Sequence, residues 1–301
     1  MKSEHDGKQM RTLSVSIVTY NCMEHLARLL SSLPAAATGL NLEILVTDNN
    51  SSDGTCAYFD AHPDLSVIRN PENRFFTAAD NQNLRRTSGE FVAMVNPDVV
   101  PAAGALSVLV QALDEHREAG AVAPLFTGPD ATRQPSSGKF PTLLYCLFEL
   151  GGINALFPGN PIEKHVMDSD THPGHGATYD AEVLYGACLV LRREILERIG
   201  FKDESLIHGW DEYDVCRRIR NTGLSLLVVP AAKCKHARGA STATFHEPAI
   251  LHRHHQNGLR VLYRKHAGPA AFLVLRVMLR IVAPFVRLAE QRRLKLRGKP
   301  D

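Results

Sequence analysis

Short runs rich in Val and Ile alternate with helical patterns along the first 120 residues of this 301-residue chain. The stretch LSVSIVTYN (13–21) precedes the amphipathic pattern MEHLARLLSSL (23–33), and LEILVTDNNSSDGT (42–55) is a second apolar run that ends in a polar loop. Short apolar runs separated by helices are typical of β-α-β units, whose strands lie parallel in one sheet. The sequence therefore predicts an α/β fold with a mainly parallel sheet flanked by helices.

The same alternation continues beyond these units. Residues 127–180 interrupt it, because they are rich in Gly, Pro, Ser and His and show little periodicity, and they predict a long, partly mobile excursion. Further strands are expected at 65–75, 90–100 and 224–230, a strand followed by a helix at 182–200, and helices at 77–89 and 104–116.

Polar residues follow three of the predicted strands, at 19–21, 48–50 and 96–98. In an open α/β sheet, ligands bind outside the carboxyl ends of the strands. A single polar strand end is usually a turn or a helix cap. Three in succession favour a binding pocket at this edge of the sheet.

A cluster of acids lies next to the only tryptophan of the chain. The segment LIHGWDEYDVCRR (206–218) places Asp211, Glu212 and Asp214 directly after Trp210. Like charges this close raise one another's pKa and cost free energy, so a purely structural segment gains nothing from them. The cluster therefore indicates a functional site.

The charge of the chain is unevenly distributed. The last 51 residues contain 12 Lys and Arg against two acids, a charge of +10, whereas the first 250 contain 22 basic and 30 acidic residues, a charge of −8. Within this basic tail, Arg276, Arg280 and Arg287 fall on one face of a helix that Pro284 is expected to kink. No uncharged run reaches the roughly 20 residues that span a bilayer, so a helix lying on a membrane surface is expected.

The alternative for the tail is an amphipathic helix packed on the body of the protein or on a second subunit, which would make the protein a homo-oligomer. Nucleic acid is not expected as a partner, because the tail has no recognition motif and no interleaved aromatic residues. The six scattered cysteines form no C-x-x-C pair, and the N-terminal residues lack an apolar signal core. These features predict a cytoplasmic protein that is peripheral on the inner face of the cell membrane.

Six motifs follow one another along the chain: SIVTYN, TDNNSSDGT, VNPDV, YGACLVLRRE, WDEYDVCRR and KHARGAST. In order and approximate spacing, over residues 13–266, they resemble those of family 2 glycosyltransferases, especially the bacterial rhamnosyltransferase-like branch. The W-D-E pattern is also similar to the W-D-D of galactofuranosyltransferases. The resemblance implies the GT-A fold, a Rossmann-like α/β domain that binds a nucleotide sugar in its first half and an acceptor in its second.

The implied organisation has four parts. Residues 1–12 form a disordered N-terminus, 13–120 bind the nucleotide sugar, 121–245 bind the acceptor and supply the catalytic residues, and 246–301 form the basic amphipathic helical tail. The His-rich run HEPAILHRHH (246–255) fits no standard set of metal ligands and is interpreted as a solvated or acceptor-side segment.

The resemblance also assigns roles at the donor end. Asn96-Pro97-Asp98 occupies the place of the family's D-x-D signature, so Asp98 would be the main protein ligand of a divalent metal, Mg²⁺ or Mn²⁺, and Asn96 would hydrogen-bond the donor. His236 would join the metal or the diphosphate, with a structural histidine as the alternative. The remaining donor contacts are expected from Thr19, Tyr20, Asn21, Asp48 and Asp53, of which Asp53 has a helix cap as its alternative role.

The family's E-D-x-D motif aligns with residues 211–214. An inverting transfer needs a general base near the acceptor hydroxyl, and the second position of the motif makes Glu212 that base, with Asp211 as the fallback. Asp214 is expected to pair with Arg217 or Arg218. Trp210 would stack on a sugar ring, with simple packing as the alternative.

The sequence therefore predicts an inverting glycosyltransferase. It would move a sugar, with rhamnose favoured, from a dTDP- or UDP-sugar to a lipid-linked saccharide in cell-envelope or surface polysaccharide synthesis. Galactofuranose or another hexose is the rival donor sugar. A catalytically silent nucleotide-sugar-binding scaffold is the rival of another class, because Asn96 and Glu212 replace commoner acids.

Overall fold

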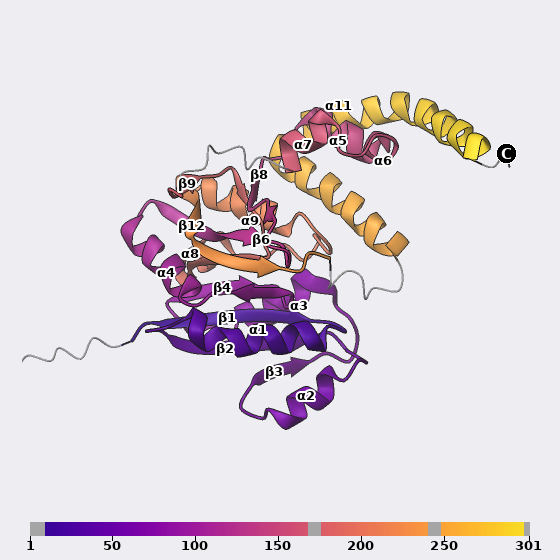
Figure 1. Cartoon of the computed structure of the whole chain (residues 1–301). Helices are drawn as coiled ribbons and strands as arrows, with labels where there is room; N and C mark the ends of the chain where they lie inside the picture. Colours follow the sequence, from indigo (N-terminus) through magenta and orange to yellow (C-terminus); the bar gives the residue numbers. More distant parts are fainter. Residues whose placement is uncertain (1–9, 168–175, 240–247, 298–301) are drawn as a thin grey trace, which may run out of the picture.

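One large mixed sheet forms the centre of the computed structural model, which describes residues 10–167, 176–239 and 248–297. Figure 1 shows this sheet between layers of helices. Its main path is β3-β2-β1-β4-β11-β6-β12-β5, and short strands β7 and β9 pair with β6 and β12. The strands on this path are β1 (Thr12–Thr19), β2 (Asn41–Asp48), β3 (Ser66–Arg69), β4 (Phe91–Val95), β5 (Val99–Pro101), β6 (Ala119–Thr127), β11 (Cys188–Arg192) and β12 (Ser225–His236).

The first half of the sheet is parallel, as the sequence predicts. Strands β3, β2, β1 and β4 run parallel to one another, and β6 runs parallel to β12. Strand β11 lies antiparallel between β4 and β6, and β5 is antiparallel to β12. Strands β1 and β4 lie at the centre and have both faces covered. Strand β4 is accordingly a continuous apolar run, whereas β1 alternates apolar residues with the buried Ser14 and Ser16.

Helices cover both faces of the sheet. Leucines of α1 (Met23–Ala36) and α4 (Ala105–Glu115) belong to the core cluster on one face. The cluster on the other face includes apolar residues of α3 (Phe75–Leu84), α8 (Arg193–Ile199) and α9 (Asp211–Arg220). The remaining short elements are α2 (Thr55–Ala61), β7 (Arg133–Gln134), β8 (Ser137–Gly138), β9 (Tyr179–Asp180) and β10 (Val183–Leu184), which pairs with β8.

The prediction of a partly mobile excursion at 127–180 is wrong for much of that segment. It contains α5 (Leu143–Leu150), α6 (Ile153–Leu156) and α7 (Pro161–Met167), while 168–175 lies outside the described residues. Tyr145 and Cys146 of α5 are buried in the core cluster. Helix α5 forms because tertiary contacts with the C-terminal helix bury its apolar residues, a stabilisation that local periodicity does not show.

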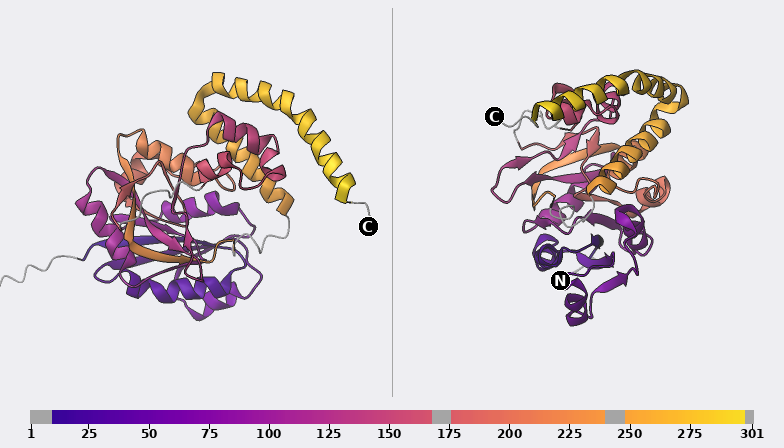
Figure 2. Two further views of the ribbon diagram at one scale, coloured as in Figure 1. Left: turned by 45° about the horizontal axis from the view of Figure 1, so that its top comes forward. Right: turned by 90° about the vertical axis from the view of Figure 1, so that its right-hand side faces the viewer.

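The predicted tail also begins as part of the folded domain. Helix α11 (Pro248–Arg297) packs on α5 and α9, and its Leu259 and Leu262 are fully buried. The kink expected at Pro284 lies instead at Gly268, whose backbone is non-helical and which precedes Pro269. Figure 2 shows the two parts of α11 meeting at an angle, with the second part extending beyond the body.

At the other end of the chain, the N-terminal segment predicted as disordered at 1–12 is ordered in its last residues. Arg11 pairs with Glu90 and Asp114, and Thr12 begins β1. Residues 1–9 lie outside the described residues.

Candidate active site

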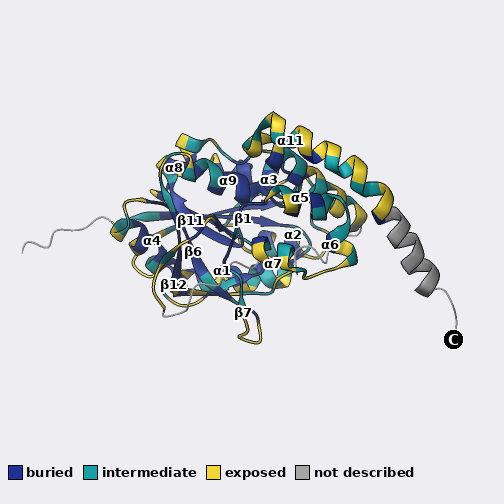
Figure 3. Cartoon of the chain, turned by 90° about the horizontal axis from the view of Figure 1, so that it is seen from above, coloured by how far each residue is buried: buried dark blue, intermediate teal, exposed yellow. Residues whose placement is uncertain are grey.

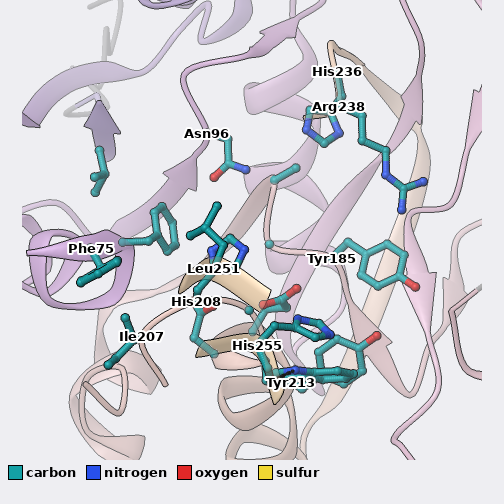
Figure 4. A pocket seen from close by; sticks show the side chains of 18 of the residues that line it. Phe75, Asn96, Tyr185, Ile207, His208, Tyr213, His236, Arg238, Leu251 and His255 are labelled. Carbon is teal, nitrogen blue, oxygen red and sulfur yellow. Dashed lines mark hydrogen bonds between the residues drawn. The ribbon is translucent and has the colours of Figure 1, made fainter. Parts of the chain in front are cut away.

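A cavity of about 370 Å³ opens beyond the carboxyl ends of the first strands. Its wall combines residues that are far apart in the sequence, from the end of β1, the turn after β4, the start of α9, the end of β12 and the first turns of α11. Figure 4 shows Asn96, His236 and Arg238 at one end of this pocket and Tyr213 and His255 at the opposite end. The predicted site residues on its wall are Tyr20, Asn96, Trp210, Asp211, Glu212 and His236.

Four other predicted donor residues bind neighbouring loops. Asn21 accepts a hydrogen bond from Ser52 N at 2.7 Å, which ties the loop after β1 to the loop after β2. Asp48 accepts from Ser51 N, and the Thr19 side chain is fully buried against Cys22. Asp53 accepts from Met23 N at 2.9 Å, at the first residue of α1, and from Thr55 N at 3.2 Å, at the first residue of α2, although the N-cap positions of these helices are Cys22 and Gly54. These contacts fix the shape of the loops at the donor end.

Asp98 lies next to His236, which lines the pocket, although Asp98 itself is not on the pocket wall. His236 Nε2 is 3.6 Å from Asp98 Oδ1, and that buried carboxylate oxygen has no hydrogen-bond partner among the described residues. Burial lowers the pKa of His236, which favours the neutral imidazole. A neutral imidazole and an unsatisfied carboxylate oxygen are suitable ligands for Mg²⁺ or Mn²⁺. No group of three such ligands occurs within the described residues, so a metal here would need oxygens from water or substrate.

Trp210 is a structural residue of the pocket wall. Its side chain is only 2% exposed, and its Nε1 donates to His255 O at 3.0 Å. The indole lies edge-on to Tyr213, with ring centroids 4.8 Å apart. The packing role left open by the sequence fits this geometry better than a stacking platform does.

Glu212 lies partly exposed on the pocket wall at the first turn of α9. Removal from water and the neighbouring Asp211 carboxylate raise its pKa to about 8. Gly186 faces its side chain so closely that a Cβ there would lie 3.2 Å from the Cβ of Glu212. Glu212 is thus a carboxylate on the pocket wall that binds its proton more tightly than an exposed glutamate does.

Asp211 is engaged differently, although it is the next residue. Its Oδ2 is 2.8 Å from Lys202 Nζ, and Asp211 is only 4% exposed. The same ammonium lies 2.8 Å from Asp80 Oδ2. This ion pair gives Asp211 a fixed partner, whereas the Glu212 carboxylate faces the pocket.

Asp214 forms the ion pair predicted for it. Its Oδ2 is 2.8 Å from Arg218 Nε, and its Oδ1 is within 2.8 Å of both Lys265 and His266 on α11. Asp214 is fully buried, so it has a structural role.

Sequence reasoning missed Lys202 and Asp80, and it did not place Phe75, Tyr185 or His255 in the pocket. A lysine within the polar run KDES is expected to be exposed to solvent. Its burial depends on Asp80 in α3, which is distant in the sequence. Phe75 could not be placed in the pocket from the sequence either, since its left-handed backbone conformation (φ 60°) is visible only in the structure.

Comparison with known proteins agrees with this geometry. The profile of "Glycosyl transferase family 2" matches residues 14–200, more than half of the chain. The chain belongs to glycosyltransferase family 2. It is therefore an enzyme of this family.

Two curated relatives are informative about this glycosyltransferase. One is the N-acetylglucosaminyl-diphospho-decaprenol L-rhamnosyltransferase of Mycobacterium tuberculosis, 29% identical over 273 residues that cover 85% of each chain. The other is the pre-mycofactocin glycosyltransferase of the same species, 25% identical over 76% of this chain and 43% of its own length.

Solved structures confirm the GT-A fold. The mannosyltransferase PcManGT from Pyrobaculum calidifontis, in complex with GDP-Man and Mn²⁺, covers 96% of this chain and 81% of its own, with a TM-score of 0.52 and 20% identity. S. aureus TarS 1-349 in complex with UDP-GlcNAc covers 84% of this chain and 66% of its own, with a TM-score of 0.54 and 17% identity. At these identities the likeness concerns the fold alone.

Proposed function

We propose that this glycosyltransferase moves a deoxyhexose, rhamnose in the first instance, from a nucleotide donor to a saccharide acceptor on a membrane lipid. Similarity to the decaprenol-linked L-rhamnosyltransferase, over 85% of both chains, supports the donor sugar and the lipid-linked acceptor. The product would enter a cell-envelope or surface polysaccharide. Galactofuranose remains the rival donor sugar, because Trp210, Asp211 and Glu212 form the W-D-E pattern.

The observation that supports catalysis is Glu212 on the pocket wall. In an inverting transfer, the acceptor hydroxyl oxygen forms a bond to the anomeric carbon while the bond from that carbon to the diphosphate oxygen breaks. The hydroxyl proton passes to the Glu212 carboxylate, and the nucleoside diphosphate leaves with the bonding electron pair. A pKa near 8 is close to the working pH, which suits a group that accepts and then releases a proton.

The donor diphosphate would lie at the opposite end of the pocket. Arg238 is on the wall there beside His236, and its guanidinium can pair with phosphate oxygens. Asp98 and His236 would hold a divalent metal, which when bound would neutralise charge on the departing diphosphate. Asn96, on the same wall, can donate to a donor oxygen.

A membrane-bound acceptor requires the enzyme to approach a membrane, and α11 has a surface suited to this. Exposed apolar residues recur every four positions along its second part, where two exposed arginines, Arg276 and Arg280, flank them. Figure 3 shows this part as largely exposed. The apolar residues are Leu273, Val277, Ile281 and Phe285, between 49% and 70% exposed, and we name them the apolar stripe.

The region Ala249–Val286 is also long and apolar enough, by length and composition, to cross a bilayer. However, Leu259 and Leu262 before the kink at Gly268 and Leu275 beyond it are fully buried in the core cluster. Attachment through the apolar stripe leaves these contacts intact, whereas insertion of the second part into a bilayer would remove Leu275 from the core. We therefore propose a peripheral cytoplasmic enzyme on the inner face of the membrane.

The decisive experiment measures nucleotide release by the purified protein. The donors are dTDP-rhamnose, UDP-galactose in furanose and pyranose forms, UDP-N-acetylglucosamine and GDP-mannose, each with a membrane lipid extract as acceptor and with Mn²⁺ or EDTA. We expect release from dTDP-rhamnose, lost in EDTA. Glu212→Gln should lower the rate by about 10²–10⁴-fold, the usual contribution of a general base.

Glu197→Gln is the matched control, because Glu197 is an exposed acid on α8 that pairs with Arg193. It should leave nucleotide release unchanged. Nucleotide release from UDP-galactofuranose instead of dTDP-rhamnose would identify galactofuranose, not rhamnose, as the donor sugar. Donor binding without release of nucleotide from any of them would show a silent binder and would refute the proposed reaction.

A further inference from the structure

Lys202 is a buried cation that the transfer chemistry described above does not use. Its ammonium lies 2.8 Å from Asp80 Oδ2 of α3 and 2.8 Å from Asp211 Oδ2 of α9, with all three side chains at most 5% exposed. The nitrogen also lies 4.4 Å from the centre of the Phe76 ring. A lysine removed from water this completely is stable only when it is paired.

The loop before α9 is fastened to α3 along its length. Lys202 N donates to Asn81 Oδ1 at 3.0 Å, and Asn81 Nδ2 donates to Lys202 O and to Glu204 Oε1, each at 2.9 Å. Thr77 Oγ1 donates to Leu206 O. These contacts hold the loop that leads to the pocket residues Ile207, His208 and Trp210.

The ion pair therefore joins the two halves of the site. Helix α3 follows the donor-side strands, and α9 bears the proposed base. Asp80 is itself oriented by a hydrogen bond from Ser16 of the central strand β1. Lys202 and Asp80 therefore connect the first turn of α9 to the central strand β1 and fix the position of that turn relative to the sheet.

We propose that Lys202 is a positioning residue: it engages Asp211, leaves Glu212 as the group that receives the proton, and fixes Glu212 relative to the donor half. This proposal rests on the proposed transfer reaction. Without the cation, the Asp211 carboxylate would lie beside Glu212 with no positive charge to balance it, which would raise the pKa of Glu212 further.

The other charged and titratable groups around Glu212 stay in place in the test. They lie on the loop before α9, on α9 itself, near β11, at the end of β12 and just after it, and on α11, and the test alters none of them. These groups are His208, Tyr213, Cys216, Tyr185, His236, Arg238 and His255.

The test compares Asp80→Asn with the double variant Lys202→Met/Asp80→Asn. The double variant removes the cation and one anion together, so it avoids two unpaired buried carboxylates and should still fold. Asp80→Asn alone is the matched control, because it keeps Lys202 on Asp211. The readouts are the pH profile of kcat and the affinity for the nucleotide donor.

We expect the double variant to move the acidic limb of the kcat profile upward by about one pH unit, with kcat near pH 7 lowered roughly tenfold. Donor affinity should stay within about twofold, and the limb should not move upward in Asp80→Asn. An unmoved limb in the double variant would overturn the proposal, since a merely structural role would change stability only.

A second readout does not depend on activity. The difference in unfolding free energy between a protein and its Glu212→Gln variant, followed over pH, reports the protonation of Glu212. This difference changes with pH until Glu212 is fully ionised in the folded protein. In the double-variant background it should reach its constant value at a pH about one unit higher than in the Asp80→Asn background. If this shift does not occur, the proposed role of Lys202 is wrong. If the shift occurs but no donor releases its nucleotide, only the proposed reaction is wrong.

Discussion

Glu212 should destabilise the folded enzyme at alkaline pH. Its pKa is about 8 in the fold, above the ordinary 4.5, so between these values the unfolded chain has released a proton that the folded protein retains. Stability from this group therefore falls as pH rises from about 4 to about 8. Glu212→Gln removes the effect and should raise the free energy of unfolding at pH 8 by about 1–3 kcal/mol, allowing for hydration of the pocket.

Urea unfolding at pH 4.5 and pH 8 checks this expectation. The gain from Glu212→Gln should shrink toward zero at the lower pH, where the folded state is protonated and the unfolded state is about half protonated. Glu197→Gln should show no such difference between the two pH values. A variant that is less stable than the wild type at pH 8 would contradict the raised pKa.

The acids of the site could be predicted from the sequence, but their partners could not. Asp211, Glu212 and Asp214 form a local charge cluster that is visible in four consecutive positions. Lys202 acquires its role only when α3 brings Asp80 next to the loop before α9. Such a contact depends on the tertiary fold, for which neither periodicity nor spacing gives a signal.

Among the elements, α9 and α11 are joined by a buried ionic contact that has a testable energy. Asp214 is fully buried, and its carboxylate accepts from Arg218 on its own helix and from His266 on α11. Although burial alone would raise it, hydrogen bonds from His266 and Lys265 hold the pKa of Asp214 at about 2. Its stabilising contribution is therefore present above about pH 4 and is lost as the pH falls toward 2.

Asp214→Asn should lower the free energy of unfolding by about 1–3 kcal/mol at pH 7, because it leaves the partly exposed Arg218 and Lys265 without their anion. Asp60→Asn is the control, since its pair with Arg69 is exposed and should contribute at most about 1 kcal/mol. The measurement is urea unfolding at constant ionic strength. Equal losses in the two variants would show that α11 is not held by Asp214.

Elements were predictable to different degrees for a physical reason. The central strands β1 and β4 are short segments rich in apolar residues, so their burial can be predicted from the local sequence. Helix α5 has only eight residues, and its N-cap Thr142 accepts from Tyr145 N, a cue that Pro- and Gly-rich surroundings obscured. Its stability comes from α11, whose own kink is set by Gly268 and not by Pro284.

For the whole molecule, α11 connects the pocket to the surface proposed to meet the membrane. Leu251 and His255 in its first turns line the pocket, and the apolar stripe lies beyond the kink on the same helix. An enzyme bound to a membrane through the stripe would therefore keep the side of the pocket that Leu251 and His255 line at a fixed distance from the lipid surface. Binding should depend on both the apolar residues and the arginines that flank them.

Cosedimentation with phosphatidylglycerol and phosphatidylcholine vesicles tests this. Arg276→Gln/Arg280→Gln should weaken binding to the anionic vesicles by about tenfold or more, at about 1 kcal/mol per arginine, with little change on neutral vesicles. Ile281→Ser/Phe285→Ser should weaken binding to both. The charge-matched control is Arg28→Gln/Arg117→Gln, which alters exposed arginines on α1 and after α4.

The two kinds of variant separate a lipid surface from a protein partner. A stripe buried between two copies of the chain would make Ile281→Ser/Phe285→Ser convert a dimer to a monomer in sedimentation without changing vesicle binding. A lipid-facing stripe would do the reverse, and it would also make transfer to a vesicle-embedded acceptor, but not donor affinity, sensitive to the substitution. If the control variant lost vesicle binding to the same extent, the attraction would depend only on the net charge of the protein. That result would show that α11 is not the membrane-binding surface.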